Sequence, residues 1–144
     1  LGILSAAMLG WFSEESRTMG TLQYRDFALK LVANPRAEGF RGKLAVLVDG
    51  LSMSTSEFFA GGVQDLGRGK IFGEKTPGMA LPSAIERLPT GDALQYTMAN
   101  YVSAGGKALE GRGVSPDFPT PLTQADLLAG KDAALDAAMK WIRD

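Results

Sequence analysis

Three serines alternate with other residues where an apolar segment runs into a predicted helix, and these side chains are the best suited to chemistry. They lie in the segment Gly50-Leu51-Ser52-Met53-Ser54-Thr55-Ser56-Glu57. The first turn of a helix presents N–H groups without partners in the helix, together with a partial positive charge. A serine there can expose its oxygen for attack on a carbonyl while nearby N–H groups stabilise the developing oxyanion. The segment is therefore a candidate nucleophile site.

The same segment also fits a purely structural role. Serine and threonine are preferred N-cap residues, and Ser54 with Glu57 matches the S-x-x-E capping box. Because neighbouring serines can take different roles, the spacing alone leaves both interpretations open.

Two residue types that support much of enzyme chemistry are missing from the sequence. The chain has no histidine and no cysteine, so it cannot by itself complete a Ser-His-Asp triad, a thiolate nucleophile or a zinc site built on these ligands. The acidic residues do not show the spacing of an EF-hand loop. We therefore expect no metal and no cofactor. Any proton transfer must use Lys, Asp, Glu or Tyr, or a group from another segment.

The composition indicates one folded domain and excludes several classes of partner. Of 144 residues, 45% are hydrophobic and 22% are charged, which is typical of globular proteins. The 15 basic and 16 acidic residues give a net charge of −1, so we expect no nucleic-acid partner. No apolar run is long enough to span a membrane. The chain begins at Leu1 rather than Met and shows no signal peptide, so we expect a fragment of a longer protein.

A strand-helix-strand unit is the clearest structural prediction. The apolar run 43–50 is typical of a strand buried on both faces of a parallel sheet. Residues 52–66 follow as a helix and 70–73 as a second strand. This order predicts a βαβ crossover, which would place the serines at the carboxyl end of a strand, where ligands bind in such sheets.

The flanking segments predict further elements. We expect a helix over residues 1–12, a strand over 18–27, strands over 80–88 and 93–102 joined by the turn Pro89-Thr90-Gly91-Asp92, a helical turn over 124–128 and a helix over 132–143. The last helix is amphipathic, and its pattern predicts that Leu135, Met139 and Ile142 face inward.

Several ordered blocks of the sequence resemble the catalytic domain of the C-terminal processing (tail-specific) serine peptidases. The blocks are Leu47-Val48-Asp49, Ser52-Met53-Ser54-Thr55-Ser56-Glu57, Gly73-Glu74-Lys75-Thr76, Leu88-Pro89-Thr90-Gly91 and Glu110-Gly111-Arg112-Gly113-Val114-Ser115-Pro116-Asp117. The likeness is nearer the branch that contains the tricorn core protease and interphotoreceptor retinoid-binding protein. The quoted blocks lie between residues 47 and 117.

This resemblance implies both a fold and an activity. It implies an α/β fold, in which residues 1–144 form the C-terminal portion of a serine peptidase catalytic domain: a partial crotonase-like ββα core with a β-hairpin arm and a C-terminal helix. It also implies peptide-bond hydrolysis through an acyl-enzyme on Ser54, with the Thr55 N–H in the oxyanion hole. Glu57 is the glutamate of the same motif and could orient the base.

The chain departs from the family where the general base is expected. In the processing peptidases a lysine lies 25 residues after the serine, but that position holds Met79. The glutamine often found four residues later is replaced by Ser83. Methionine has no titratable group and cannot take a proton from Ser54. Lys75 is four residues too early, although it is the better of the nearby lysines as a replacement.

Three explanations of Met79 remain open from the sequence. The base could be a histidine from a segment that precedes this chain, as in the tricorn-like branch, which is the explanation we expect. Alternatively, the protein has lost catalysis and binds peptides or small apolar ligands in the same cleft. In the third, Met79 is an introduced replacement for lysine.

The resemblance also suggests partners and a compartment. The expected partner is a peptide or an unfolded protein substrate, which would bind by adding a strand beside the site. The sequence is compatible with an oligomer but does not predict one. A periplasmic or exported location is suggested by the resemblance alone, and the residues themselves leave the compartment unknown.

Overall fold

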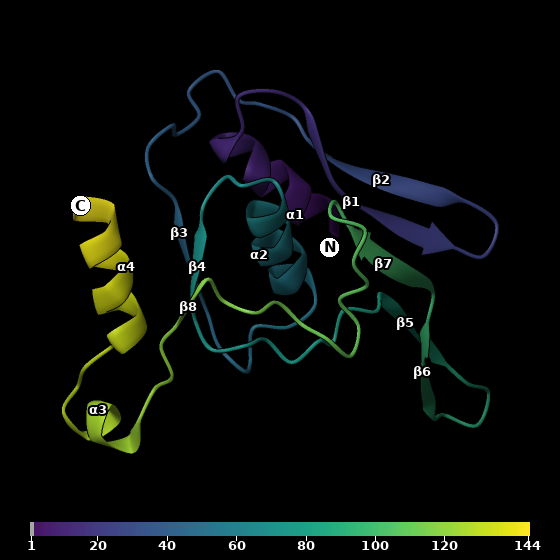
Figure 1. Cartoon of the computed structure of the whole chain (residues 1–144). Helices are drawn as coiled ribbons and strands as arrows, with labels where there is room; N and C mark the ends of the chain where they lie inside the picture. The colour runs from purple at the N-terminus through teal and green to yellow at the C-terminus, as the bar shows by residue number, and fades with distance from the viewer. Residues whose placement is uncertain (1) are drawn as a thin grey trace.

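A computed structural model describes residues 2–144 and shows a mixed α/β fold around one central helix (Figure 1). In chain order the elements are α1 (Gly2–Leu9), the 3₁₀ turn η1 (Gly10–Phe12), β1 (Arg17–Tyr24), β2 (Ala28–Ala33), β3 (Ala45–Val48), α2 (Thr55–Asp65), β4 (Lys70–Gly73), β5 (Ser83–Arg87), β6 (Ala93–Thr97), β7 (Ala99–Ser103), β8 (Phe118–Pro119), α3 (Gln124–Leu128) and α4 (Ala133–Arg143). The expected α/β class is confirmed.

The predicted βαβ unit forms the centre of the molecule. Strands β3 and β4 pair in parallel, with Val48 beside Gly73, and α2 connects them. The short strand β8 extends this sheet along the other edge of β4. The prediction that β3 is buried on both faces is wrong, because Leu47 is 46% exposed and only Val48 of this strand is buried. An apolar run shows that a strand exists but not how many layers cover it.

A second sheet covers the opposite side of α2, and its order could not be foreseen. It is antiparallel with the order β2-β1-β7. Strand β2 was not predicted. The strand expected over 93–102 is divided at Met98, whose N–H bonds to the Pro82 carbonyl at 2.9 Å. The first part pairs with β5 in a hairpin arm, and the second joins the sheet beside β1.

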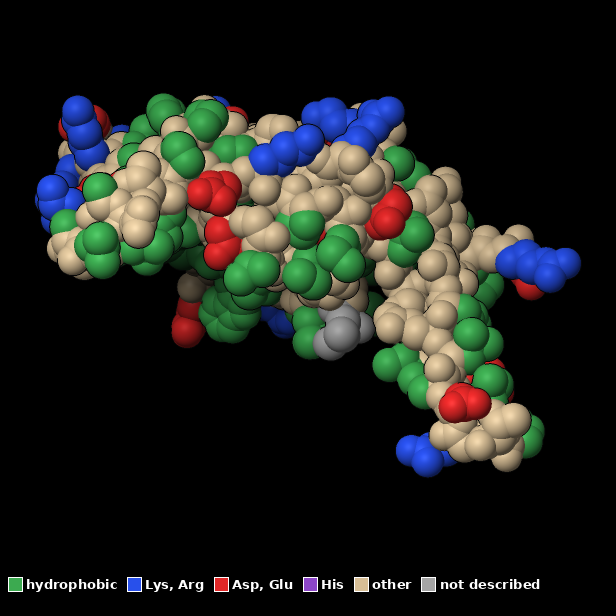
Figure 2. Space-filling model, turned by 90° about the horizontal axis from the view of Figure 1, so that it is seen from below, with side chains coloured by type: hydrophobic (Ala, Val, Ile, Leu, Met, Phe, Trp, Pro, Cys, Tyr) green, Lys and Arg blue, Asp and Glu red, His purple; other side chains and the backbone are tan. Residues whose placement is uncertain are grey.

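The arm formed by β5 and β6 leaves the body of the protein. In the space-filling view it is the narrow extension at the lower right, with hydrophobic side chains on its surface (Figure 2). Ile85 on the arm is 72% exposed. Two strands alone bury little surface, so the arm depends on its root for its position.

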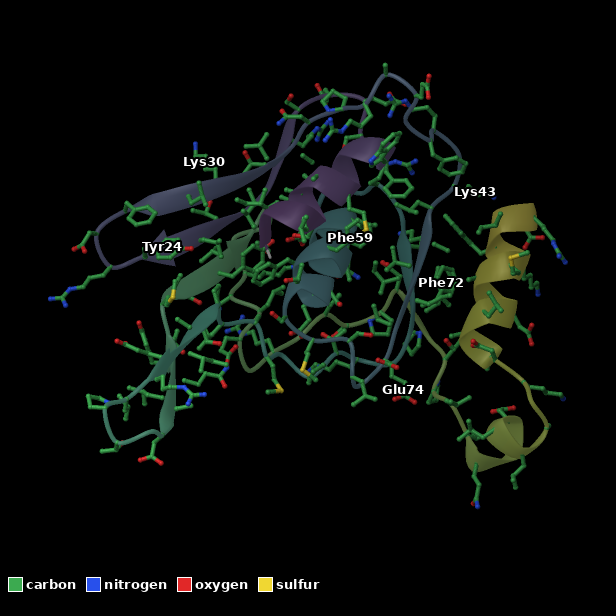
Figure 3. The ribbon with its side chains drawn as sticks, turned by 180° about the vertical axis from the view of Figure 1, so that it is seen from behind. Tyr24, Lys30, Lys43, Phe59, Phe72 and Glu74 are labelled. Carbon is green, nitrogen blue, oxygen red and sulfur yellow. The ribbon has the colours of Figure 1, made fainter. Side chains whose placement is uncertain are left out.

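The terminal helix α4 packs on β3 and β4, but with a different face from the one predicted. Leu135, Met139 and Ile142 are 44%, 38% and 41% exposed, so the expectation that they face inward is wrong. Ala138 is buried instead, and the Trp141 ring lies 5.8 Å from the ring of Phe72. Figure 3 shows Phe72 on the sheet, directed toward this helix.

The physical reason is the size of the indole. A large aromatic ring takes the space over the sheet, and the helix then turns so that a small residue one turn away meets the strands. The Lys43 ammonium adds to the same contact, because it bonds to the Trp141 carbonyl at 3.0 Å (Figure 3).

Close packing between α2 and β7 depends on a glycine in β1. The Tyr101 ring stacks on Phe58 with centroids 3.9 Å apart, and its hydroxyl donates to the Met19 carbonyl at 2.9 Å. Burial and the nearby Asp65 carboxylate raise the pKa of Tyr101, so the phenol stays a neutral donor. Any Cβ at Gly20 would lie 2.5 Å from carbons of this ring.

We therefore expect Gly20→Ala to lower the free energy of unfolding by about 3 kcal/mol, because the tyrosine must leave its stacked position. Urea denaturation measures this. Gly50→Ala is the matched control, since a Cβ at Gly50 meets nothing within 4 Å. Equal midpoints for the two variants would contradict the packing described.

Candidate active site

Ser54 occupies a backbone conformation that side chains rarely adopt. Its φ is 58° and its ψ is −119°, and it is the only non-glycine residue with positive φ among residues 2–144. The Ser56 N–H donates to the Met53 carbonyl at 3.2 Å, which together with these angles fits the first central position of a type II′ turn. Glycine normally fills that position, and a side chain there costs about 1–3 kcal/mol. Strain of this kind is characteristic of functional sites.

A buried glutamate holds this turn in place. Glu57 is fully buried, and its Oε2 accepts the Ser54 N–H at 3.0 Å. Its Oε1 accepts the Thr76 hydroxyl at 2.6 Å and the Gly78 N–H at 2.7 Å. Three donors from two loops therefore converge on one carboxylate, which fixes the turn against the segment that follows β4.

The predicted capping box is present, but it leaves the Ser54 hydroxyl available. Ser54 is the N-cap of α2, and Glu57 bonds back to its N–H. The Ser54 side chain faces the Glu57 N–H in the arrangement of the box but makes no cap hydrogen bond, and the Glu57 N–H donates to the Ser54 carbonyl at 2.9 Å. The backbone of Ser54 therefore supplies the hydrogen bonds at the start of α2.

The other serines of the segment differ from Ser54. The Ser52 hydroxyl donates to Asp49 at 2.7 Å, and the Leu51 N–H donates to the same carboxylate at 2.9 Å. These bonds, with the Ser52 hydroxyl first, lower the pKa of Asp49. Ser56 is exposed within the first turn of α2. Asp49 and Ser52 line a different pocket from Ser54, so the hydroxyls of Ser52 and Ser54 face different surroundings.

Thr76 is the part of the site that the sequence did not single out for a role. It is 2% exposed, and its hydroxyl accepts the Val114 N–H at 2.7 Å while donating to Glu57. The Thr76 N–H donates to the Val114 carbonyl at 3.1 Å. The glycine-rich loop after β7 is thereby connected to Ser54 through two buried side chains. No local pattern signals this, because the partners are far apart in the chain.

The Ser54 side chain opens into a groove of about 390 Å³ between the turn and the root of the arm. The lining residues are Met53, Ser54, Met79, Leu81, Ser83, Gln95, Tyr96, Thr97 and Glu110. Met79 is 58% exposed there, and its carbonyl accepts the Ser54 N–H at 3.1 Å. The Glu110 carboxylate accepts the Ala80 N–H at 2.7 Å and is the carboxylate of this groove.

Lys75 does not share this groove. It lines a separate pocket with Asp65, Lys107 and Arg112, so it is not placed to replace a lysine at position 79. Within residues 2–144, no group of three or more potential metal-ligating side chains comes together. None of the helices described is both long and apolar enough to cross a lipid bilayer.

The strain at Ser54 predicts that replacing this residue with glycine relieves a cost in folding stability that alanine keeps. We expect Ser54→Gly to be more stable than Ser54→Ala by about 1 kcal/mol, since glycine relieves the positive φ and alanine keeps the Cβ. Urea denaturation of the two variants gives the difference. Ser56→Gly is the control. Because Ser56 lies within helix α2, glycine there should lower the free energy of unfolding by about 1 kcal/mol. A Ser54→Gly protein less stable than Ser54→Ala would show that the turn is unstrained.

Sequence and structure comparisons agree on one group of proteins. The model for peptidase family S41 matches residues 8–120. A probable CtpA-like serine protease of Staphylococcus haemolyticus (strain JCSC1435) is 28% identical over 120 residues, which is 81% of this chain and 24% of that protein. The chain therefore spans about a quarter of the length of this curated relative.

Solved structures agree with this match. The photosystem II D1 C-terminal processing protease superposes with a TM-score of 0.65 at 28% identity, over 83% of this chain and 30% of that one. A protein of Parabacteroides merdae ATCC 43184 gives a TM-score of 0.83 at 20% identity, over 99% of this chain and 48% of that one, a likeness that shows the fold alone. The expected fold family is confirmed.

Proposed function

Since this chain belongs to peptidase family S41, we propose that Ser54 is the nucleophile of a serine peptidase that hydrolyses peptide bonds through an acyl-enzyme. The observation that carries the proposal is the strained turn at Ser54, which presents an uncapped hydroxyl to an open groove. A residue needed only for capping would not require this backbone conformation.

The proposed reaction divides its steps between residues of this chain and a general base from outside it. The Ser54 oxygen attacks the substrate carbonyl and forms the C–O bond, and its proton passes to a general base. The N–H of Thr55, at the first position of α2, donates to the oxyanion because it has no acceptor within the helix. The base then protonates the leaving amine, and water hydrolyses the ester. Glu57 acts as a positioning residue that holds the Ser54 backbone.

The general base is proposed to come from polypeptide beyond these 144 residues. No lysine or histidine lines the Ser54 groove in the part of the chain that the structure describes. Met79 stands where the resemblance expects lysine and cannot accept a proton. The isolated chain should therefore be inactive, whereas the full-length protein should act on extended peptides.

The groove also supports a second candidate function. The apolar side chains of Met53, Met79 and Leu81 line it. This favours a catalytically inactive domain that binds peptides or small apolar ligands. The two candidates differ in the reactivity of Ser54 and not in the presence of the groove.

Covalent labelling of the full-length protein separates the two functions. A peptidase should react with a fluorophosphonate, and digestion with mass spectrometry should place the adduct on Ser54. Failure of a folded full-length protein to react would overturn the proposal and favour the binding domain. Peptide turnover by the purified 144-residue chain would contradict the external base.

A further inference from the structure

We infer that Gln95 is a substrate-positioning residue that hydrogen-bonds the backbone of an extended peptide lying beside Ser54. The inference rests on the proposed function for the location of the substrate. It concerns the arm, whose strands project from the body and whose root forms one wall of the groove (Figures 1 and 2).

The strand register places three polar side chains on one face of the arm. Ser83 lies opposite Thr97, and Gln95 lies opposite Ile85. Because side chains alternate along a strand, Ser83, Gln95 and Thr97 share a face. All three line the groove that contains Ser54. These three side chains bring hydrogen-bonding groups to the groove, whereas its lining residues Met79 and Leu81 are apolar.

The Gln95 carboxamide is oriented by its neighbour. Its Nε2 donates to the Ser83 Oγ at 2.8 Å. Within residues 2–144 the second hydrogen of Nε2 and the Oε1 atom have no protein partner. The amide therefore keeps one donor and one acceptor available to a ligand in the groove. A peptide group offers the complementary carbonyl and N–H, so the two can form a pair of hydrogen bonds.

This arrangement gives a role to Ser83, which stands where the resemblance to the processing peptidases expects a glutamine. The Ser83 hydroxyl accepts a hydrogen bond from Gln95 on the facing strand. The carboxamide is thus supplied by β6. An anchored side chain loses less rotamer freedom when a ligand binds, so the pair is suited to recognition.

Binding to a catalytically silent protein tests the inference directly. In a full-length Ser54→Ala background, fluorescein-labelled casein peptides are titrated and followed by fluorescence anisotropy. Gln95→Leu should raise the Kd about 10-fold, because it removes both hydrogen bonds and keeps the size of the side chain. Ser83→Ala should raise the Kd about 3-fold, since it frees the amide without removing it. An unchanged Kd for Gln95→Leu would overturn the inference.

Kinetics of the serine-competent protein distinguish positioning from a structural role. Gln95→Leu should raise KM for a peptide about 10-fold with kcat retained, and the rate of fluorophosphonate labelling should not change, because that probe has no peptide backbone. Equal loss of labelling and peptide hydrolysis would show that Gln95 acts through Ser54 and would reject the inference.

A matched control guards against a general effect of the substitution. Gln23→Leu places the same change on an exposed position of β1, away from the groove, and should alter neither Kd nor KM. Absence of labelling in the otherwise wild-type protein would refute the proposed function alone, because the anisotropy experiment does not need Ser54.

Discussion

A Ser54→Ala variant of the full-length protein is expected to hydrolyse peptides about 10⁴-fold more slowly than the wild type, or worse. The substitution removes the oxygen that is proposed to form the acyl-enzyme, and effects of this size follow the loss of a serine nucleophile. The fold should be retained, because the Ser54 hydroxyl makes no cap hydrogen bond and the N–H that bonds to Glu57 is still present. Steady-state cleavage of a fluorogenic peptide measures the rate.

Neighbouring serines provide the controls for this prediction. Ser56→Ala changes an exposed hydroxyl two residues away and should leave the rate within a few-fold of wild type. Ser52→Ala removes a bond to Asp49 in a different pocket and should affect stability more than catalysis. If Ser54→Ala retains activity that is lost in Ser52→Ala, then the assignment of the nucleophile is wrong.

Removing Glu57 is expected to have the largest effect on stability. We predict that Glu57→Ala lowers the free energy of unfolding by about 4 kcal/mol. The substitution removes the buried carboxylate that accepts hydrogen bonds from Ser54, Thr76 and Gly78. That is a large share of the about 5–15 kcal/mol typical of a domain, so part of the protein should be unfolded at 37 °C. Urea denaturation followed by circular dichroism gives the value.

The conservative variant separates packing from hydrogen bonding. Glu57→Gln keeps the shape but replaces one oxygen with an NH₂ group, which must then face the Ser54 N–H or the Thr76 and Gly78 donors. We expect a loss of about 2 kcal/mol together with slower labelling of Ser54. Glu86→Ala, on the exposed arm, should change stability by less than about 0.5 kcal/mol. A Glu57→Gln protein as stable and as reactive as the wild type would contradict the role of this carboxylate.

Elements with strong local signals agree between sequence and structure. The βαβ unit, the Pro89–Asp92 turn, the capping box and the helical turn at α3 were all predicted, because hydrophobic runs, turn residues and caps act over a few neighbouring positions. Strand β2 was missed for the opposite reason. Its segment is ambiguous alone and becomes a strand through pairing with β1.

Some features of the candidate site could likewise be predicted from the sequence, and others could not. The segment around Ser54 could be found from residue types and their order, and so could the absence of a lysine at position 79. The convergence of Glu57, Thr76 and Val114 could not, since these contacts join segments 19 and 38 residues apart. Likewise, only the fold shows that Lys75 lines another pocket and that Glu110 shares the groove.

The sequence by itself determined the class of fold, the family and the serine proposed as the nucleophile, because each is expressed in short segments whose physics is local. Only the tertiary structure decided which face of α4 meets the sheet, how Glu57 holds a strained turn, and which side chains of the arm reach the groove. Those outcomes depend on competition for space and for hydrogen-bond partners among residues distant in the chain, and no local pattern contains that information.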